Sequence, residues 1–343
     1  MRLETFIRQM PKVELHVHLE GSIQPETLLE LARRNQVKLP ATTVEGLRRW
    51  YTFTNFAHFI EIYLTISSCI CSAEDIELIA REFLRGQAAQ NIQHSEVTFT
   101  PYTHFSLNRQ IPFADQLAAL SRARDWAAEE LGISVSWVLD ISRNVRPVEH
   151  GLVVADWVIA GKDNGVVALG LGGPEIGHPP ELFAEAFDRV RAAGLASVPH
   201  AGETVGADSM RNALKILGAQ RIGHGVRCLE DADLVAELRE RQIPLEVCPT
   251  SNVCLGVAAS IADHPLPQLL EAGLYVTINS DDPPMFNTTL TDEYLKVTEA
   301  FGFDVETIER LVINAVRASL LPESARTVLE EKFGREFAAL RLG

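Results

Sequence analysis

The sequence has too little positive charge to suit a polyanionic partner. Its 343 residues include 46 acidic and only 31 basic side chains, which gives a formal net charge of −15 at pH 7. A surface of this sign repels nucleic acids and anionic lipids on average. We therefore expect a small molecule as the ligand and no nucleic-acid or membrane partner, and we make no prediction about protein partners.

Long apolar segments are absent as well. No stretch approaches 18 uninterrupted apolar residues, and the N-terminal segment MRLETFIRQMPK lacks the apolar core of a signal peptide. These absences lead us to expect a cytoplasmic protein. The five cysteines are an odd number without a C-x-x-C pair, so we interpret them as reduced thiols rather than as a structural zinc site.

Linkers and repeats are also missing. The chain contains no Ser/Gly-rich linker, low-complexity tract or fixed-period repeat that would mark a domain boundary. Its composition, 46% hydrophobic and 22% charged, is that of an ordinary globular protein, which excludes disorder. We expect a single domain over residues 1–343, a length that α/β barrels with insertions can reach.

What the chain does contain is eight short apolar runs rich in β-branched residues, separated by longer segments of helical period. The runs are VELHVHL (13–19), HSEVTFTP (94–101), VSWVLDIS (135–142), VVALGLGG (166–173), ASVPHAGE (196–203), RIGHG (221–225), PLEVCPTS (244–251) and YVTINSDD (275–282). Strands that alternate with helices predict a parallel sheet, and eight such units predict a (β/α)₈ TIM barrel with additional helices. A doubly wound open sheet is the alternative, but no G-x-G-x-x-G follows the first run, and nearly every run ends in polar residues.

The stretch KVELHVHLEG places two histidines, His16 and His18, on one face of the first predicted strand, because alternate residues share a face. His200 ends the fifth run and Asp281 ends the eighth. A barrel brings the carboxyl ends of these strands to one mouth. Three imidazoles and a carboxylate suit one zinc ion that keeps a position for water and lowers the pKa of that water to about 7. A structural pair of buried histidines is the alternative for His16 and His18 taken alone.

Three further polar residues lie where a hydrolase needs groups that handle protons. Glu203 follows the fifth run and is a candidate general acid or base, although a lone glutamate there is more often a first-turn helix residue. His224 is flanked by glycines, whereas a core histidine more often has apolar neighbours. Asp282 adjoins Asp281 and, if the strand continues, points elsewhere, toward the cavity.

Five segments, PKVELHVHLEGS, PHAGET, RIGHGVR, LEVCPTSN and INSDDPPMF, resemble the adenosine deaminase family of metal-dependent hydrolases, in the same order along nearly the whole chain. The resemblance implies a TIM barrel that deaminates an aminopurine at C6 by hydrolysis, with no organic cofactor. It also implies one zinc ion per chain, bound by His16, His18, His200 and Asp281.

The same resemblance implies roles for the remaining site residues. Glu203 would protonate the purine nitrogen N1, while His224 and Asp282 would orient the attacking hydroxide. Asp282 would also face N7, and the backbone N–H of Gly173 would contact N3. The chemistry agrees with these roles, because C6 of an aminopurine is a poor electrophile until N1 is protonated.

The segment FTNFAHFIEIYL places Phe56, Phe59, Ile60 and Tyr63 on a single helical stripe. Periodicity alone favours an ordinary core face. In the family that the chain resembles, a helix at this place covers the pocket, so we expect these four residues to cover a purine and to exclude water.

Two departures from the family pattern bear on the substrate. Nucleoside-specific members have an aspartate where this chain has Glu20, which we expect to contact the part of the substrate beyond the purine ring. Adenine deaminases tend to have an aspartate where this chain has Gly223, which favours a nucleoside. The expected reaction is therefore adenosine to inosine plus ammonia, and the alternatives are adenine or an adenosine altered at its 5′ position, such as aminodeoxyfutalosine or a thioadenosine.

Two other classes of function were weighed. A different metal hydrolase, such as an esterase, is possible because fold and metal do not fix the substrate. A barrel that binds zinc and purine without catalysis is disfavoured, because the acid Glu203, His224 and both aspartates are all present.

Overall fold

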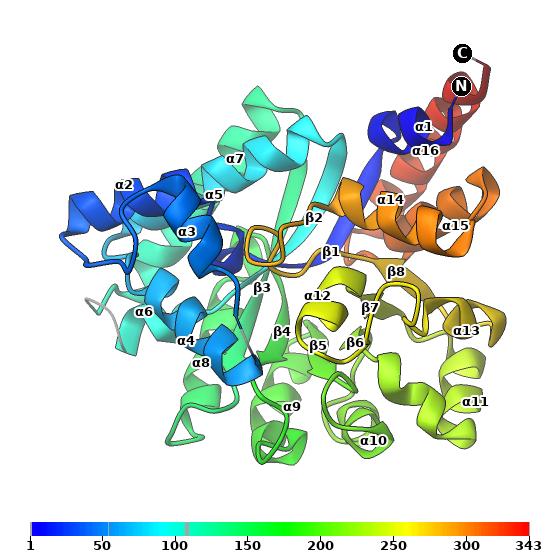
Figure 1. Ribbon diagram of the computed structural model, residues 1–343. Helices are drawn as coiled ribbons and strands as arrows, with labels where there is room; N and C mark the ends of the chain where they lie inside the picture. The colour runs from blue at the N-terminus through cyan, green and yellow to red at the C-terminus, as the bar shows by residue number, and fades with distance from the viewer. Residues whose placement is uncertain (1, 54, 107–109, 343) are drawn as a thin grey trace.

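The computed structural model describes residues 2–53, 55–106 and 110–342. Eight parallel strands pair in sequence order, and helices surround them (Figure 1). The last strand meets the first, because Val17 is bridged in parallel to Asp281 and the N–H of His18 donates to the carbonyl of Asp281 across 2.9 Å. The predicted (β/α)₈ TIM barrel is therefore confirmed.

The strands lie within or close to the eight predicted apolar runs. Their bounds are β1 (Lys12–His18), β2 (Ile92–Phe99), β3 (Ser134–Ser142), β4 (Val166–Gly172), β5 (Ala196–Ala201), β6 (Ile222–His224), β7 (Leu245–Val247) and β8 (Val276–Ile278). The polar residues at the ends of the runs therefore lie at the carboxyl edge of the barrel, where active sites of this fold are built.

Helices fill every connection between consecutive strands. Their bounds are α1 (Leu3–Gln9), α2 (Pro25–Asn35), α3 (Val44–Trp50), α4 (Phe56–Ser67), α5 (Ala73–Ala89), α6 (Pro101–Ser106), α7 (Phe113–Glu130), α8 (His150–Ala160), α9 (Ala184–Ala192), α10 (Ala207–Lys215), α11 (Ala232–Arg241), α12 (Pro249–Cys254), α13 (Leu266–Glu271), α14 (Leu290–Phe301), α15 (Val305–Ala318) and α16 (Glu323–Leu342). Short 3₁₀ turns cover Glu20–Ser22, Lys162–Asn164, Pro180–Phe183 and Val226–Glu230.

The first strand shows why the sequence alternates as it does. Val13 and Val17 belong to the apolar clusters that the helices complete, whereas Glu14, His16 and His18 are buried polar residues on the opposite face. Since alternate residues share a face, the polar set points into the barrel. The two histidines of the opening motif therefore lie on the inner face at the carboxyl end of β1.

The inside of the barrel is filled unevenly. Val138, Ala168, Ala196 and Val198, from β3, β4 and β5, form a small apolar cluster of their own. Small and branched side chains of this kind fill the interior of such barrels, which makes it a core rather than a pore. This cluster fills the inside of the barrel next to these three strands with apolar side chains.

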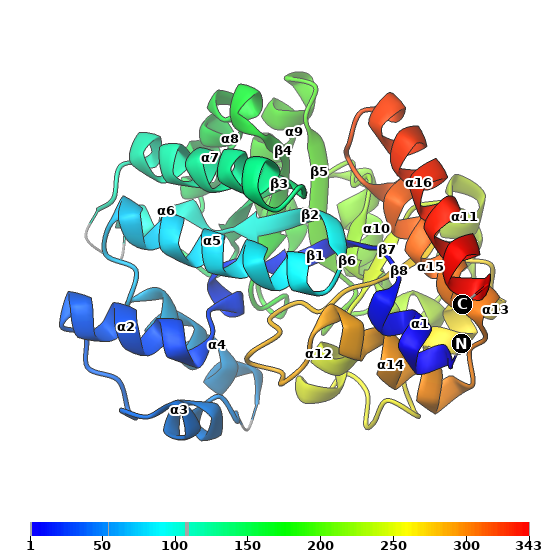
Figure 2. The same cartoon turned by 90° about the horizontal axis from the view of Figure 1, so that it is seen from above.

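Helix α4 and the two termini occupy opposite parts of the molecule. The side chain of Asn55 caps α4 by accepting from the N–H of His58 across 3.0 Å, and α4 crosses in front of the strands in Figure 1. The two ends of the chain lie together in Figure 1 and Figure 2, where the rings of Phe6 in α1 and Phe337 in α16 pack 5.9 Å apart. Within the described part of the chain, no helix combines the length and apolarity that crossing a bilayer requires.

Candidate active site and metal centre

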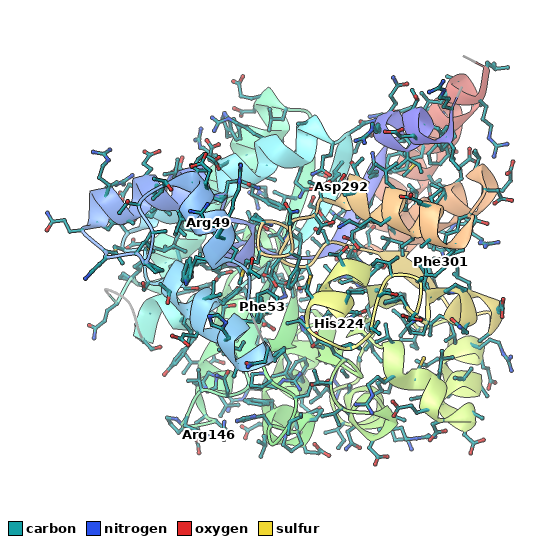
Figure 3. The ribbon with its side chains drawn as sticks, viewed as in Figure 1. Arg49, Phe53, Arg146, His224, Asp292 and Phe301 are labelled. Carbon is teal, nitrogen blue, oxygen red and sulfur yellow. The ribbon has the colours of Figure 1, made fainter. Side chains whose placement is uncertain are left out.

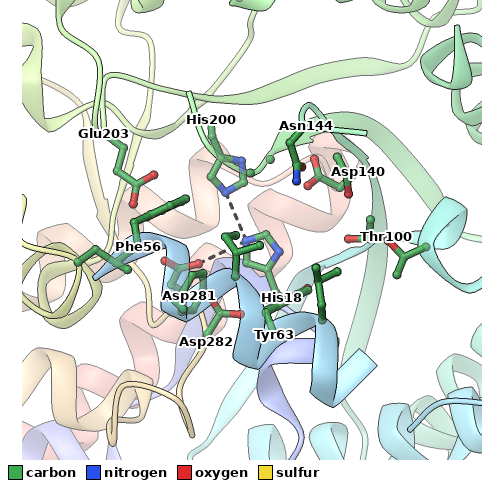
Figure 4. Close-up of a pocket in the computed structure, with 18 of the residues that line it drawn as sticks. His18, Phe56, Tyr63, Thr100, Asp140, Asn144, His200, Glu203, Asp281 and Asp282 are labelled. Carbon is green, nitrogen blue, oxygen red and sulfur yellow. Dashed lines mark hydrogen bonds and ion pairs between the residues drawn. The ribbon is translucent and has the colours of Figure 1, made fainter. Parts of the chain in front are cut away.

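Four side chains that are remote in sequence converge at the carboxyl ends of the strands. The Nε2 atom of His18 lies 3.3 Å from Nε2 of His200 and 3.3 Å from Oδ1 of Asp281. Nε2 of His16 lies 3.5 Å from the same Asp281 oxygen. Figure 4 shows His18, His200 and Asp281 pointing toward one another. The structure thus brings together all four residues that the resemblance implied as metal ligands.

The geometry of this cluster suits a divalent cation. Two nitrogen ligands that lie about 2.0–2.1 Å from a tetrahedral zinc ion are themselves about 3.3 Å apart, and His18 and His200 already have this spacing. Nε2 of His16 is buried without a hydrogen-bond partner. The ligand atoms of His16, His200, His224 and Asp281 all lie within 4.8 Å of one another. A buried nitrogen without a partner in such a group indicates a position for a cation.

The electrostatics of the cluster point the same way. Burial disfavours the charged form of His16, but the neighbouring carboxylates of Asp281 and Glu246 outweigh burial and raise its pKa to about 10. Burial is likewise outweighed at His18, whose neighbours Asp282 and Asp281 raise its pKa to about 9. The surrounding carboxylates therefore carry an excess of negative charge that a cation would neutralise.

Buried partners hold the ligand side chains in place from behind. Nδ1 of His16 donates to Oε2 of Glu246 across 2.9 Å, and Oε1 of Glu246 accepts from Nε of Arg221 across 2.6 Å. Arg221 also pairs with Glu96 across 2.6 Å. On the other side, the hydroxyl of Ser251 donates to Oδ2 of Asp281 across 2.6 Å. Such outer partners orient metal ligands and strengthen their binding.

Backbone strain is concentrated at two of the site residues. His224 and Asp281 have φ angles of 61° and 65°, in the left-handed region that residues other than glycine seldom adopt. Each such conformation costs on the order of 1–3 kcal/mol and persists only where the surroundings enforce it. Figure 3 shows His224 near the middle of the barrel. These backbone conformations, at the end of β6 and just after β8, point both side chains toward the site where the three histidines and Asp281 converge.

Glu203 follows β5 on a turn that a second carboxylate fixes. Both oxygens of Glu175 accept backbone N–H groups of this turn, those of Gly202 and Glu203 each across 3.0 Å and that of Thr204 across 2.6 Å. Burial, with Asp281 and Glu175 adding to it, raises the pKa of Glu203 to about 8. Glu203 therefore carries a proton at neutral pH and can act as an acid.

A chain of hydrogen bonds fixes the tautomer of His224. The N–H of Leu266 donates to Nδ1 of His264 across 3.1 Å, so the His264 proton is on Nε2 and is donated to Oδ1 of Asn252 across 3.0 Å. The Asn252 amide nitrogen then donates to Nδ1 of His224 across 3.3 Å. The proton of His224 is therefore on Nε2, which lies 3.7 Å from Glu203 and 3.9 Å from Asp281. His224 presents a hydrogen-bond donor to the site.

Asp282 lies beside the cluster with a free oxygen. Its Oδ1 is buried without a hydrogen-bond partner, and the side chain lines the same cavity as Glu203 and His200. Burial together with the neighbouring charge of Asp281 raises the pKa of Asp282 well above its ordinary value. Its unpartnered oxygen leaves this carboxyl able to form a hydrogen bond with a ligand in the cavity.

A cavity opens over these residues, and the empty space within it and at its open mouth together measures about 800 Å³. The four residues of the predicted stripe, Phe56, Phe59, Ile60 and Tyr63, all line it, as does Leu64. Figure 4 shows Phe56 and Tyr63 beside the metal cluster. The predicted helical lid over the carboxyl face is therefore confirmed as part of the fold.

The two remaining predicted substrate contacts lie in different surroundings. Gly173 lines the cavity. Glu20 is not among the lining residues; its carboxylate accepts from the N–H of Thr100 across 2.9 Å and the hydroxyl of Tyr63 across 3.3 Å, and contacts Nε2 of His104 at 3.0 Å. β1 ends at His18 and a 3₁₀ turn begins at Glu20, so Glu20 does not lie on a continuation of the strand. Its contact with the substrate stays a prediction.

Several residues of the site leave no local pattern in the sequence. They are Glu175, Asn252 and His264, whose hydrogen bonds join segments that lie far apart in the chain. The polar wall of the cavity, formed by β2, β3 and the segments that follow them, was not predicted either; it consists of Thr100, Thr103, Asp140, Ser142 and Asn144. Asp140, the acidic residue of the run VSWVLDIS, is the member of this wall that the sequence could have indicated.

The chain is similar to known deaminases along nearly its whole length. The chain is 42% identical over 330 residues to an aminodeoxyfutalosine deaminase of Streptomyces avermitilis, covering 94% of this chain and 90% of the relative. It is 38% identical over 327 residues to an adenine deaminase of Crocosphaera subtropica, covering 95% and 99%. Among solved structures, a zinc-bound amidohydrolase from B. ambifaria superposes with a TM-score of 0.91 at 25% identity, covering 98% and 93%.

The family itself is shown by a match to a family model. The sequence model described as adenosine deaminase matches residues 11–335, which is nearly the whole chain and includes every residue of the site described above. The chain belongs to the adenosine deaminase family.

Proposed function

We propose that this aminohydrolase is zinc-dependent and removes the C6 amino group of an adenine ring by hydrolysis, and that its substrate is an adenosine altered at the 5′ position, of which aminodeoxyfutalosine is the example. The observation that carries the proposal is the juxtaposition of a protonated acid, Glu203, with the buried cluster of three histidines and Asp281 in one cavity. An acid and a cation site on one cavity are what attack at C6 of an aminopurine requires.

The cation site would be formed by His16, His18, His200 and Asp281. A bound zinc ion would activate a water molecule for attack and stabilise developing negative charge. Zinc is supported by the nitrogen-rich set of ligands, which suits this borderline-soft ion, and by the zinc that the amidohydrolase from B. ambifaria contains.

Glu203 donates its proton to N1 of the purine. Protonation at N1 draws electron density from the neighbouring C6 and lets the ring lose aromaticity as the water adds. Glu175 contributes by holding the turn that bears Glu203, through hydrogen bonds of 3.0 Å to the N–H of Glu203 and 2.6 Å to that of Thr204. The acid is thus both protonated and fixed in position before the substrate binds.

His224 and Asp282 orient the other reacting groups. The Nε2–H of His224 donates to the oxygen of the attacking water, because its other nitrogen is occupied by Asn252. Burial lowers the pKa of His224 to about 4, so the imidazole stays neutral. Asp282, whose pKa is raised, donates to N7 of the purine, and the N–H of Gly173 donates to N3.

The named relatives favour an adenine ring, either free or carrying a sugar altered at the 5′ position. The relative from Streptomyces avermitilis is named aminodeoxyfutalosine deaminase and that from Crocosphaera subtropica adenine deaminase, so adenosine itself, the first expectation from the sequence, gains no specific support from these two.

Gly223 separates the two remaining candidates. A Cβ atom at Gly223 would lie 2.8 Å from Cε1 of His16 and 3.2 Å from the His200 ring. The aspartate that adenine-specific members tend to have here would displace His16 in this chain. Adenine therefore ranks second, with the named adenine deaminase as its support.

A panel of substrates tests the proposal. Purified protein is incubated with aminodeoxyfutalosine, a 5′-thioadenosine, adenosine and adenine, and turnover is followed by the purine ultraviolet absorbance and by released ammonia. We expect the highest kcat/KM with a 5′-altered nucleoside. A preference for adenine of tenfold or more would overturn the choice of substrate, and failure to release ammonia from any of them would overturn the reaction.

A further inference from the structure

The wall of the cavity away from the metal cluster is polar, and the reaction leaves it without a role. Asp140 and Ser142 of β3, with Asn144 just after it and Thr100 and Thr103 after β2, all line the cavity. Figure 4 shows Asp140, Asn144 and Thr100 on the opposite side of the close-up from Glu203, with His18 and His200 between them. Hydrogen-bonding groups that lie away from Glu203 and the metal-ligand residues indicate recognition of a part of the substrate that does not react.

Asp140 is the charged member of this wall, and one of its oxygens lacks a partner. The residue is 3% exposed, and its Oδ1 is buried without a hydrogen-bond partner among the described residues. A buried polar group left without a partner is costly and rare in proteins. Burial raises the pKa of Asp140 to about 7. A ligand that supplies a hydrogen-bond donor would remove this cost.

The neighbouring strand leaves space for the Asp140 carboxyl. A Cβ atom at Gly172 would lie 2.3 Å from Oδ2 of Asp140, and one at Gly170 would lie 2.7 Å from Oδ1. Neither position can take a larger residue unless the carboxyl moves. Two glycines in β4 thus allow this carboxyl its place in the inner face of the barrel.

A second carboxylate on this side of the site, Glu20, is already in use. It accepts from the N–H of Thr100 and the hydroxyl of Tyr63, and contacts His104 at 3.0 Å. Contact with a substrate would require one of these partners to be exchanged. Asp140, in contrast, lines the cavity and has an oxygen to offer.

The position of the purine, which rests on the proposed function, decides what reaches this wall. C6 faces the cation site at the ends of β1, β5 and β8, Glu203 after β5 takes N1, and Asp282 after β8 takes N7. The edge of the ring that remains carries N3, C4 and N9, and it faces β2, β3 and β4. The group attached to N9 therefore points toward the polar wall.

We propose that Asp140 is a specificity-determining residue that accepts a hydrogen bond from a ribose hydroxyl of the substrate, so that the enzyme selects purines that carry a sugar at N9. The ring N–H of free adenine is the other donor that could reach the same carboxyl, and the experiment separates the two. Ser142, Asn144 and the two threonines complete a polar surface for the sugar.

Two variants and four substrates test this assignment. Asp140→Ala and Asp140→Asn are assayed with adenosine, 2′-deoxyadenosine, 3′-deoxyadenosine and adenine, beside the surface control Asp156→Ala, whose side chain is 64% exposed. A lost hydrogen bond to a charged group corresponds to roughly a 10- to 100-fold fall in kcat/KM. We expect that fall for adenosine with Asp140→Ala, carried mainly by KM, and a change within about twofold for adenine.

The deoxynucleosides identify the hydroxyl. In wild type, removing the hydroxyl that Asp140 binds should cost as much as Asp140→Ala does with adenosine, and combining the two changes should cost no more than either alone. Metal content and circular dichroism of each variant establish that it is folded, and Asp140→Asn, which keeps the shape, replaces Asp140→Ala if the latter does not fold.

Three results would overturn the proposal. Equal losses with every substrate would make Asp140 structural, a loss with adenine alone would assign it to the ring N–H, and no loss with any substrate would remove it from recognition. A wild-type enzyme that deaminates neither these nucleosides nor a 5′-altered adenosine would contradict the proposed function as well. An active wild type with an unaffected Asp140→Ala variant would contradict only the inference on Asp140.

Discussion

The carboxylate of Glu175 offers the sharpest test of how the site is organised. It touches no substrate in the proposed reaction, yet it accepts the N–H groups of Gly202, Glu203, Thr204 and Val205. Burial opposes its ionisation, but Arg143 and these donors hold the pKa of Glu175 below its ordinary value. Glu175 therefore acts on the reaction through the position of Glu203.

The expected size of the effect comes from the hydrogen bonds that Glu175→Gln removes. A glutamine has one acceptor oxygen, and its amide nitrogen cannot accept the N–H groups that Oε2 of Glu175 now takes. A hydrogen bond to a charged group contributes roughly 1.5–3 kcal/mol. If about 3 kcal/mol of this stabilisation is lost in the transition state, kcat falls roughly 100-fold, because each 1.36 kcal/mol is a factor of ten.

The assay is steady-state turnover of a 5′-altered adenosine, with metal content measured on the same samples. We expect kcat to fall, the metal content to stay at the wild-type level, and the alkaline limb of the pH profile to move to lower pH, because the charge of Glu175 helps to raise the pKa of Glu203. The matched control is Glu185→Gln, whose side chain is 69% exposed and pairs with Arg189 at the surface. A kcat within about twofold of wild type, with an unchanged pH profile, would refute this account of Glu175.

Four further predictions test other parts of the site. Glu203→Gln should keep the metal and the fold but lower turnover at least 10²- to 10⁴-fold, roughly the usual range for general acid catalysis; near-normal turnover would exclude Glu203 as the acid. In wild type, kcat/KM should fall as pH rises through a limb at or below about 8, because the raised pKa of Glu203 keeps the required proton only below it and a bound cation lowers that pKa; a profile flat to pH 10 would contradict this. Glu246→Gln should weaken metal binding roughly 10- to 100-fold in a chelator competition, because His16 loses its charged partner across 2.9 Å; an unchanged affinity would argue against it. His264→Ala should lower kcat about tenfold with metal content unchanged, because His224 loses the chain that fixes its tautomer, whereas His264→Gln keeps a donor and should recover most of the activity; equal activity of both variants would count against the chain.

Local patterns in the sequence were enough to predict the barrel and much of its mouth. The apolar runs that contain His18, His200 and His224 predicted strands β1, β5 and β6, and period-2 alternation alone placed His16 and His18 on one face. The helical stripe from Phe56 to Tyr63 could not by itself be distinguished from a core face, and the family resemblance supplied the interpretation as a lid. The single domain over residues 1–343 stays a prediction.

Other features depend on contacts between distant segments and could not be predicted this way. A strand that continued past His18 would point Glu20 into the mouth of the barrel, but a 3₁₀ turn begins at Glu20 and its carboxylate contacts Thr100 and His104 instead. The role of His264 has no local signal, because its link through Asn252 to His224 joins loops that only the folded barrel brings together.

The central claim is that the cluster of three histidines and Asp281 binds a metal that deamination at C6 requires. The most direct measurement is ammonia release from aminodeoxyfutalosine by protein of known metal content, before metal removal, after it, and after zinc is restored. The account predicts one ammonia for each purine converted, loss of activity in the metal-free protein, and its return with one zinc ion per chain. Full activity of metal-free protein, or no ammonia from the zinc-loaded protein with any adenine-ring substrate, would contradict it.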